Sequence, residues 1–277
     1  MPARKAIHMH PLCCRTVGTS VESANGTTAA FFDLDKTIIS RSSTLAFAPS
    51  FYRMGLISRV QVLRGACAQL TFRLSGASHY RMQRVRDQVS ALCRGWDAAQ
   101  IERIVAEKLD EVIAPHVYAE ARELLDAHRR EGHDVLIAST SGQEIVAPIA
   151  AMLGACAVVA TRLEVAGGRY TGLVDCYAYG QAKADQVREL AYQRGYCLAD
   201  CFAYTDSVTD LPLLEMVGHP HVVNPDRALR KIAVARAWPV LAFSQTGCLP
   251  AARAVGAAGM ASCAGQPAER DQAIPDM

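Results

Sequence analysis

The chain has 277 residues, of which 51% are hydrophobic and 20% are charged, and its formal net charge is +2. This length allows one large hydrophobic core, or a core with a smaller accessory domain. The near-neutral charge excludes a whole-protein argument for nucleic-acid binding, so we expect no nucleic-acid partner.

Residues 1–28 are rich in Ser, Thr, Gly and Asn, and we expect a disordered leader. His8, His10 and the pair Cys13-Cys14 offer adventitious metal ligands, but a flexible terminus is the preferred interpretation. No continuous apolar segment follows the basic residues near the start, which argues against a secretory signal.

The stretch FFDLDKT, residues 31–37, carries the strongest chemical pattern. The apolar residues 29–32 predict a buried parallel strand. Asp33 and Asp35 follow at its carboxyl end, two residues apart and therefore on one side of an extended chain. Such a pair can bind a hard cation such as Mg²⁺, and one carboxylate can act as a nucleophile while the other moves protons. A strand that runs into an ordinary polar turn is the alternative.

Residues 45–114 show helical periodicity without a strand signal, which predicts an all-helical cap inserted after the first strand. Asp97 is the expected N-cap of a helix near 101–113. Between Tyr52 and Arg94 the insert has a single acidic residue, Asp87, and eight arginines: Arg53, Arg59, Arg64, Arg73, Arg81, Arg84, Arg86 and Arg94. Two interpretations stay open, an anion-attracting lid for a phosphorylated substrate or an acidic membrane surface, and solvated helix faces.

From Pro115 the pattern alternates between strands and helices. Helices are expected at 118–130, 143–153, 183–194, 208–218 and 225–235, strands at 134–138, 156–160, 201–206, 219–224 and 238–243, a polar turn at 139–142, and a hairpin that turns at Gly167-Gly168. Repeated strand–helix units predict an α/β fold with a doubly wound parallel sheet. We assign the core to 29–44 and 115–243.

Residues 244–277 are rich in Ala, Gly, Ser and Pro, and we expect a disordered tail. The mildly apolar run Val255–Ala264 is too short to cross a bilayer, which needs about 20 residues. We therefore expect no transmembrane segment.

The ten cysteines are scattered: Cys13, Cys14, Cys67, Cys93, Cys156, Cys176, Cys197, Cys201, Cys248 and Cys263. No C-x-x-C pair and no zinc-type spacing occurs among them. We predict reduced thiols, mostly buried, in a cytoplasmic protein.

Further polar residues are expected where later strands end, the edge at which doubly wound sheets bind ligands. Ser139 and the next backbone N–H can hold a phosphate at a helix N-terminus, although Ser139 alone predicts an N-cap. Lys183 can neutralise a phosphate and a carboxylate. Asp206 can complete a Mg²⁺ site, and Asp210, four residues later, can turn back toward it.

In this order, FFDLDKT, Ser139, Lys183 and YTDSVTDLP resemble the motifs of the haloacid dehalogenase (HAD) superfamily over residues 29–235. The helical insert directly after the first motif resembles subfamily IB, which contains phosphoserine phosphatase. The resemblance implies a phosphoric monoester hydrolase that uses an aspartyl-phosphate intermediate, with a small phosphomonoester as its substrate.

The resemblance also implies the residue roles. Asp33 would be the nucleophile and Asp35 the general acid and base. Mg²⁺ would be held by Asp33, Asp35 and Asp206, with Asp210 orienting this site. Phosphoryl oxygens would be bound by Ser139, Thr140 and Lys183.

Several alternatives stay open at this point. Related cation pumps carry threonine where this chain has Asp35, and an aspartate there favours turnover by water. A phosphomutase or phosphotransferase is the second enzyme hypothesis, and a non-catalytic phosphate-ligand binding protein is the third.

Two departures from phosphoserine phosphatases bear on the substrate. Ser42 occupies the place of a glutamate that pairs with the substrate ammonium, and Thr140-Ser141 replace two glycines. Both argue against phosphoserine, and the arginine-rich insert favours a lipid or another acidic phosphomonoester.

Overall fold

The computed structural model describes residues 27–57 and 90–247. The predicted leader and tail lie almost wholly outside these ranges. So does much of the predicted cap, including most of its arginines.

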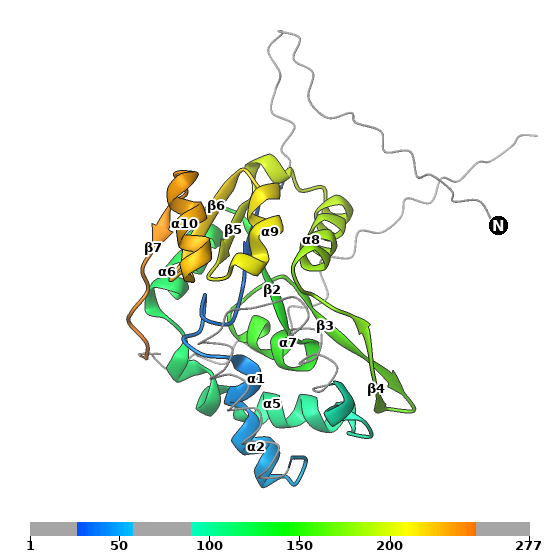
Figure 1. Ribbon diagram of the computed structural model, residues 1–277. Helices are drawn as coiled ribbons and strands as arrows, with labels where there is room; N and C mark the ends of the chain where they lie inside the picture. The colour runs from blue at the N-terminus through cyan, green and yellow to red at the C-terminus, as the bar shows by residue number, and fades with distance from the viewer. Residues whose placement is uncertain (1–26, 58–89, 248–277) are drawn as a thin grey trace, which may run out of the picture.

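A seven-stranded sheet forms the centre of the described chain (Figure 1), in the order β4-β3-β2-β1-β5-β6-β7. The strands are β1 Ala29–Phe32, β2 Asp134–Gly142, β3 Ala157–Ala166, β4 Arg169–Cys176, β5 Phe202–Thr205, β6 His219–Val223 and β7 Val240–Leu241. All neighbours pair in parallel except β3 and β4, which form an antiparallel hairpin. The predicted α/β class, the parallel sheet and the hairpin turn are confirmed.

Helices cover both faces of the sheet. Their bounds are α1 Ser43–Ala46, α2 Ala48–Arg53, α5 Ala98–Val112, α6 Ala119–Arg130, α7 Gln143–Met152, α8 Gln181–Arg194, α9 Leu211–Met216 and α10 Arg227–Ala235, with short 3₁₀ turns η1 Ala114–His116, η2 Leu198–Asp200 and η3 Val208–Asp210. Asp97 caps α5 as predicted, because its Oδ1 accepts a hydrogen bond from the backbone N of Gln100 at 2.9 Å. In Figure 1, α1, α2 and α5 lie together beyond one end of the sheet.

The central strand β1 is fully buried, which explains its unbroken apolar sequence. Successive side chains of a strand point to opposite faces. Accordingly, Phe32 packs into the hydrophobic cluster that includes Leu125 of α6 and Ile149 of α7. Phe31 packs into the second cluster, which includes Val187 of α8. One strand therefore ties the two hydrophobic layers together.

The second strand is longer than predicted. The polar residues 139–142 suggested a turn, but β2 continues through them to Gly142. The neighbouring strand explains this difference: Gly142 pairs with Thr161, whose hydroxyl donates to the carbonyl of Thr140 at 2.7 Å. Cross-strand partners of this kind hold a polar segment extended, and local sequence does not reveal them.

The described cysteines form no disulfide, as expected. The prediction that most are buried is wrong for this part of the chain, because Cys201 is buried whereas Cys156 and Cys197 are exposed. Among the described residues, no helix combines the length and apolar character that crossing a bilayer requires.

Gly218 gives a test of the close packing between η2 and β6. A Cβ atom at this position would lie 1.6 Å from the carbonyl oxygen of Ala199. Since this contact is with backbone, we expect Gly218→Ala to lower the free energy of unfolding by about 1–3 kcal/mol. Urea denaturation measures the change. Gly142→Ala is the control, because its nearest contact is 3.4 Å from a flexible side chain, and equal stabilities of the two variants would contradict the prediction.

Candidate active site

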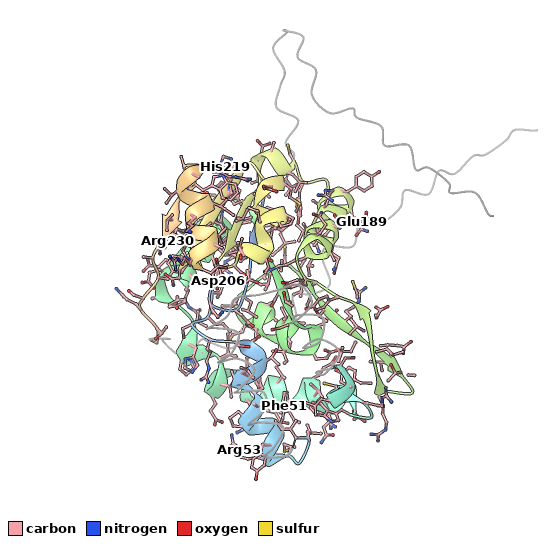
Figure 2. All side chains as sticks on the ribbon, viewed as in Figure 1. Phe51, Arg53, Glu189, Asp206, His219 and Arg230 are labelled. Atoms are coloured by element: carbon pink, nitrogen blue, oxygen red, sulfur yellow. The ribbon has the colours of Figure 1, made fainter. Side chains whose placement is uncertain are left out.

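The strand register brings the predicted site residues to one edge of the sheet. Phe32 pairs with Ile137 of β2 and with Tyr204 of β5. Asp33 and Asp206 therefore follow the ends of β1 and β5, and Ser139 lies beside them in the carboxyl-terminal half of β2. The backbone N of Asp33 also donates to the carbonyl of Tyr204 at 2.8 Å. Figure 2 shows Asp206 on the side of the sheet that faces α1 and α2.

Lys183 lies at the centre of this edge. Its side chain is fully buried, and its Nζ donates to Asp33 Oδ1 and to Asp210 Oδ2, both at 2.8 Å. Thr205 Oγ1 donates to the same Asp210 oxygen at 2.8 Å. A buried charge is tolerated when it is paired and hydrogen-bonded, and Lys183 meets both conditions. Asp210 therefore contacts the lysine that orients Asp33.

Gly180 allows the helix that carries Lys183 to begin where it does. It is the N-cap of α8 and has a φ of +55°, a conformation that costs glycine little and other residues much more. Lys183 consequently lies in the first turn of α8, two residues inside the observed helix start at Gln181.

Asp35 is held by a separate group of hydroxyl residues. Its Oδ1 accepts from the backbone N of Ser43 at 2.9 Å, and its Oδ2 accepts from Ser141 Oγ at 3.1 Å. Ser141 in turn accepts from Ser43 Oγ at 3.0 Å and from Thr44 Oγ1 at 3.1 Å. Ser141 thus fixes the orientation of Asp35.

The loop that carries Asp206 is fixed by Asp226. The Asp226 side chain caps α10 by accepting from the N–H groups of Ala228 and Leu229, and it also accepts from Val208 N at 2.8 Å. Its own backbone N donates to the Asp206 carbonyl at 2.8 Å. Asp226 therefore joins the start of α10 to the loop after β5.

Burial raises the pKa of Asp33, and the nearby carboxylates of Asp210 and Asp35 raise it further, against the opposing charge of Lys183. Burial likewise raises the pKa of Asp206, and Asp33 adds to this effect. The pKa of Asp35 is also raised by burial, although hydrogen bonds from Ser43 and Ser141 oppose the shift. These directions describe carboxylates crowded where water does not fully solvate them.

This crowding makes the edge suited to a hard divalent cation. Lys36 Nζ approaches Asp206 Oδ2 only to 4.0 Å and is 43% exposed, so it compensates that carboxylate incompletely. Mg²⁺ prefers carboxylate and carbonyl oxygens, and such oxygens are what Asp33, Asp35 and Asp206 provide. The residues present therefore fit the ion implied by the sequence.

Ser139 is buried within β2, and its Oγ accepts from the backbone N of Ser141 at 3.2 Å. The prediction that it sits at a helix start is wrong, because α7 begins at Gln143 with Gly142 as its N-cap. Thr140 follows in the same strand, and its carbonyl accepts a hydrogen bond from the Thr161 hydroxyl. Both residues remain at the carboxyl end of β2.

Four supporting residues were missed from the sequence: Ser43, Ser141, Thr205 and Asp226. Asp226 carried a usable signal, since an aspartate after Pro225 and before a helical pattern is a typical N-cap. Ser43, Ser141 and Thr205 carried no such signal, because their hydrogen bonds depend on how the chain packs in three dimensions.

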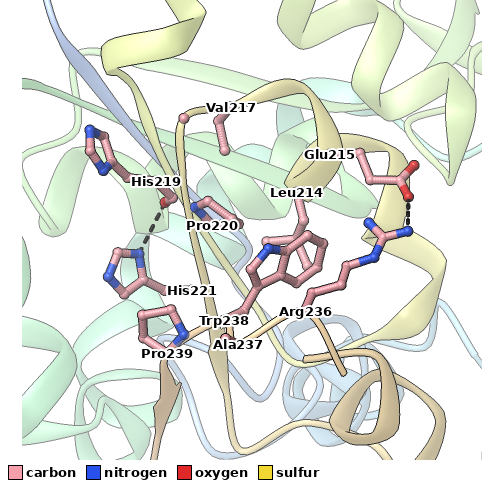
Figure 3. Close-up of a pocket in the computed structure, with 11 residues that line it drawn as sticks. Leu214, Glu215, Val217, His219, Pro220, His221, Arg236, Ala237, Trp238 and Pro239 are labelled. Carbon is pink, nitrogen blue, oxygen red and sulfur yellow. Dashed lines mark hydrogen bonds and ion pairs between the residues drawn. The ribbon is translucent and has the colours of Figure 1, made fainter. Parts of the chain in front are cut away.

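One cavity lies away from these carboxylates. It has a volume of about 690 Å³ and is lined by residues of α9, β6 and the segment before β7. Figure 3 shows the ion pair between Arg236 and Glu215, at 2.6 Å, and the bond between His221 Nδ1 and the His219 carbonyl, at 3.0 Å. β6 begins at His219, so this cavity opens at the amino end of the strand.

Residues 30–215 match the model of the haloacid dehalogenase-like hydrolase family. The chain belongs to this family. It is 57% identical over 217 residues to the inhibition of morphological differentiation protein of Streptomyces azureus, covering 78% of each chain. It is 55% identical over 218 residues to a probable phosphatase of Mycobacterium tuberculosis strain H37Rv, covering 79% of this chain and 76% of that one.

A substrate-bound phosphoserine phosphatase has a similar structure, with a TM-score of 0.58 and 19% identity over 78% of this chain and 92% of that one. At this identity the likeness supports the shared fold alone.

The triad of Lys183, Asp33 and Asp210 generates a stability prediction. Lys183→Met leaves two buried carboxylates without their cation, so we expect the free energy of unfolding to fall by about 3–5 kcal/mol. Denaturant titration monitored by circular dichroism measures this.

Lys36→Met is the matched control, because the Lys36 side chain is 43% exposed and its ion pair with Asp206 is long, so its loss should change stability by less than about 1 kcal/mol. The double variant Lys183→Met/Asp210→Asn should regain part of the loss, since it removes one of the unpaired charges. A Lys183→Met protein as stable as the wild type would contradict the account.

Proposed function

We propose that this protein is a Mg²⁺-dependent phosphatase that hydrolyses a small phosphomonoester through an aspartyl-phosphate at Asp33. The observation that carries the proposal is the buried Asp33 carboxylate, bonded to Lys183 through Oδ1, beside a second carboxylate that is oriented by hydroxyl groups. Family membership and the relative named as a probable phosphatase support it.

In the first step, Asp33 attacks phosphorus while the bond to the leaving oxygen breaks in line. We assign the attack to Oδ2 of Asp33. Oδ1 accepts a hydrogen bond from Lys183, whereas the hydrogen bond from Thr37 Oγ1 to Oδ2 is long, at 3.4 Å, and leaves Oδ2 more available. Asp35 donates its proton to the leaving oxygen, and its raised pKa suits an acid that carries a proton before the reaction.

In the second step, Asp35 removes a proton from water as the water oxygen attacks phosphorus. The bond between Asp33 and phosphorus breaks, which releases phosphate and restores both carboxyl groups. Ser139, the backbone of Thr140 and Lys183 hold the phosphoryl oxygens. Asp33 and Asp206, together with the backbone carbonyl of Asp35, would hold Mg²⁺, which would neutralise the charge of the phosphoryl group. Asp210 would act through Lys183.

We propose that residues 45–114 form a helical cap on the core 29–44 and 115–243. The described helices α1, α2 and α5 support this division. A cavity of about 250 Å³ between α5 and α7 is lined by Glu102 and Glu144, so aminoalcohol phosphates belong in a substrate panel beside lipid and sugar phosphates. A cytoplasmic location and contact between the basic cap and membranes are further proposals.

Phosphate release tests the proposal. The panel comprises p-nitrophenyl phosphate, phosphoserine, an aminoalcohol phosphate, sugar phosphates, nucleotides and lysophosphatidic acid, each with and without Mg²⁺. We expect Mg²⁺-dependent activity on some members, and Asp33→Asn to lower it by more than about a thousandfold because the nucleophile is lost.

Asp200→Asn, an exposed change, should keep wild-type activity. If the wild-type protein is folded and binds Mg²⁺ but releases phosphate from no member of the panel, the hydrolase proposal is wrong. Adding acceptor alcohols then tests the phosphotransferase or phosphomutase alternative, and binding without turnover would indicate a phosphate-ligand binding protein.

The role of Asp35 gives a separate prediction. Its loss should slow hydrolysis of the intermediate by about 10²–10⁴-fold, whereas the nitrophenolate group leaves without a proton. With an activated, ³²P-labelled aryl phosphate, Asp35→Asn should therefore accumulate acid-stable labelled protein. The double variant Asp33→Asn/Asp35→Asn should carry no label. If the double variant carried as much label as Asp35→Asn, Asp33 would not be the nucleophile.

A further inference from the structure

Three metal-ligating side chains lie together where α6 leads into β2, and the proposed reaction uses none of them. His128 is in the last turn of α6, and Glu131 and His133 follow it. One ligand atom from each residue lies within 4.8 Å of the other two. We call these residues the histidine site.

The histidine site is at the opposite edge of the sheet from Asp33. His133 immediately precedes β2, and its ring stacks on Phe202, the first residue of β5. His219, the first residue of β6, also stacks on Phe202, and Figure 2 shows His219 at the far end of the core from Asp206. Any ligand bound here is therefore separate from the phosphate-binding edge.

The backbone preorganises the two histidines. Gly132 has a φ of +78°, which ends α6, and His133 N donates to the His128 carbonyl at 2.9 Å. This tight turn brings the two Nδ1 atoms to 2.9 Å from each other. Neutral imidazoles can share only one proton across such a contact, so one ring nitrogen presents a lone pair to the other.

His128 is the rigid member of the pair. Its ring is buried, with 4% exposure, and its Nε2 lies 2.8 Å from the hydroxyl of Tyr204. Burial lowers the pKa of His128 to about 4, with a further contribution from His133, so the ring is neutral near pH 7. Metal-ligating histidines typically donate their second ring N–H to an oxygen, and Tyr204 supplies that oxygen.

Glu131 and His133 provide the open side of the site. The Glu131 side chain is 62% exposed, and its Oε2 lies 3.6 Å from His133 Nδ1, whose ring is 19% exposed. The Glu131 carboxylate can therefore rotate toward an ion that is bound by the two imidazoles. Solvent reaches the remaining position.

We propose that His128, His133 and Glu131 bind a transition-metal ion of the zinc class, with water as a fourth ligand. Two imidazole nitrogens and one carboxylate are a common zinc set with an open position, whereas Mg²⁺ prefers oxygen ligands alone. Zinc–nitrogen bonds of about 2.05 Å at a tetrahedral angle separate the nitrogens by about 3.3 Å, so the rings need to move apart by only about 0.4 Å. When the metal binds, the proton shared by the two Nδ1 atoms moves to His133 Nε2, so the protein releases no proton.

Zinc binding by the full chain tests this proposal. Equilibrium dialysis against Zn²⁺ in excess Mg²⁺, which occupies the carboxylate edge, should give one more bound equivalent for wild type than for His133→Ala. Contributions from the leader residues His8, His10, Cys13 and Cys14 are the same in every variant and cancel. Glu131→Gln should weaken this equivalent about tenfold.

His219→Ala is the matched control, because it removes an imidazole from the same ring stack without removing a ligand. It should bind zinc as wild type does, and Co²⁺ should give a tetrahedral ligand-field spectrum in both proteins but not in His133→Ala. Wild-type zinc binding by His133→Ala, or equal loss in His219→Ala, would overturn the proposal. If His133→Ala fails to fold, unchanged zinc affinity of the exposed variant Glu131→Gln would overturn it instead.

Discussion

Lys183 is fully buried, and its ammonium group bonds to carboxylates that follow two different strands, Asp33 after β1 and Asp210 after β5. Burial alone would lower the pKa of Lys183, but Asp210 and Asp33 outweigh this effect and raise it. The lysine therefore stays charged where solvent cannot reach it. The position of the Asp33 carboxylate and the joining of α8 to the carboxyl edge of the sheet both depend on this interaction.

The sequence predicted the parts of the site that are local in the chain. Asp33, Asp35 and Asp206 each end or follow an apolar strand, and a parallel sheet brings such ends together. It could not predict that Ser141 would orient Asp35 across 106 positions, because that contact depends on how β2 is held by β3. The same neighbour explains why residues 139–142 are extended rather than a turn.

The two edges of the sheet differ in their chemistry. The carboxyl edge gathers oxygen ligands and a buried lysine, which suit phosphoryl groups and a hard cation. The amino edge gathers imidazoles stacked on Phe202, beside the α6–β2 turn. The spacing of the two histidines did not predict the histidine site. Side chains five residues apart come together here because Gly132 reverses the chain between them.

In the proposed reaction, the phosphoryl group passes to Asp33 before it reaches water. Sodium borohydride reduces an acyl phosphate to an alcohol, so adding it to the wild-type enzyme during turnover of an aryl phosphate marks the residue that carried the phosphoryl group. Peptide mass spectrometry should then find homoserine in place of Asp33, only when substrate and Mg²⁺ are both present. An unmodified Asp33 in an enzyme that is turning over, or reduction at another carboxylate, would contradict the account.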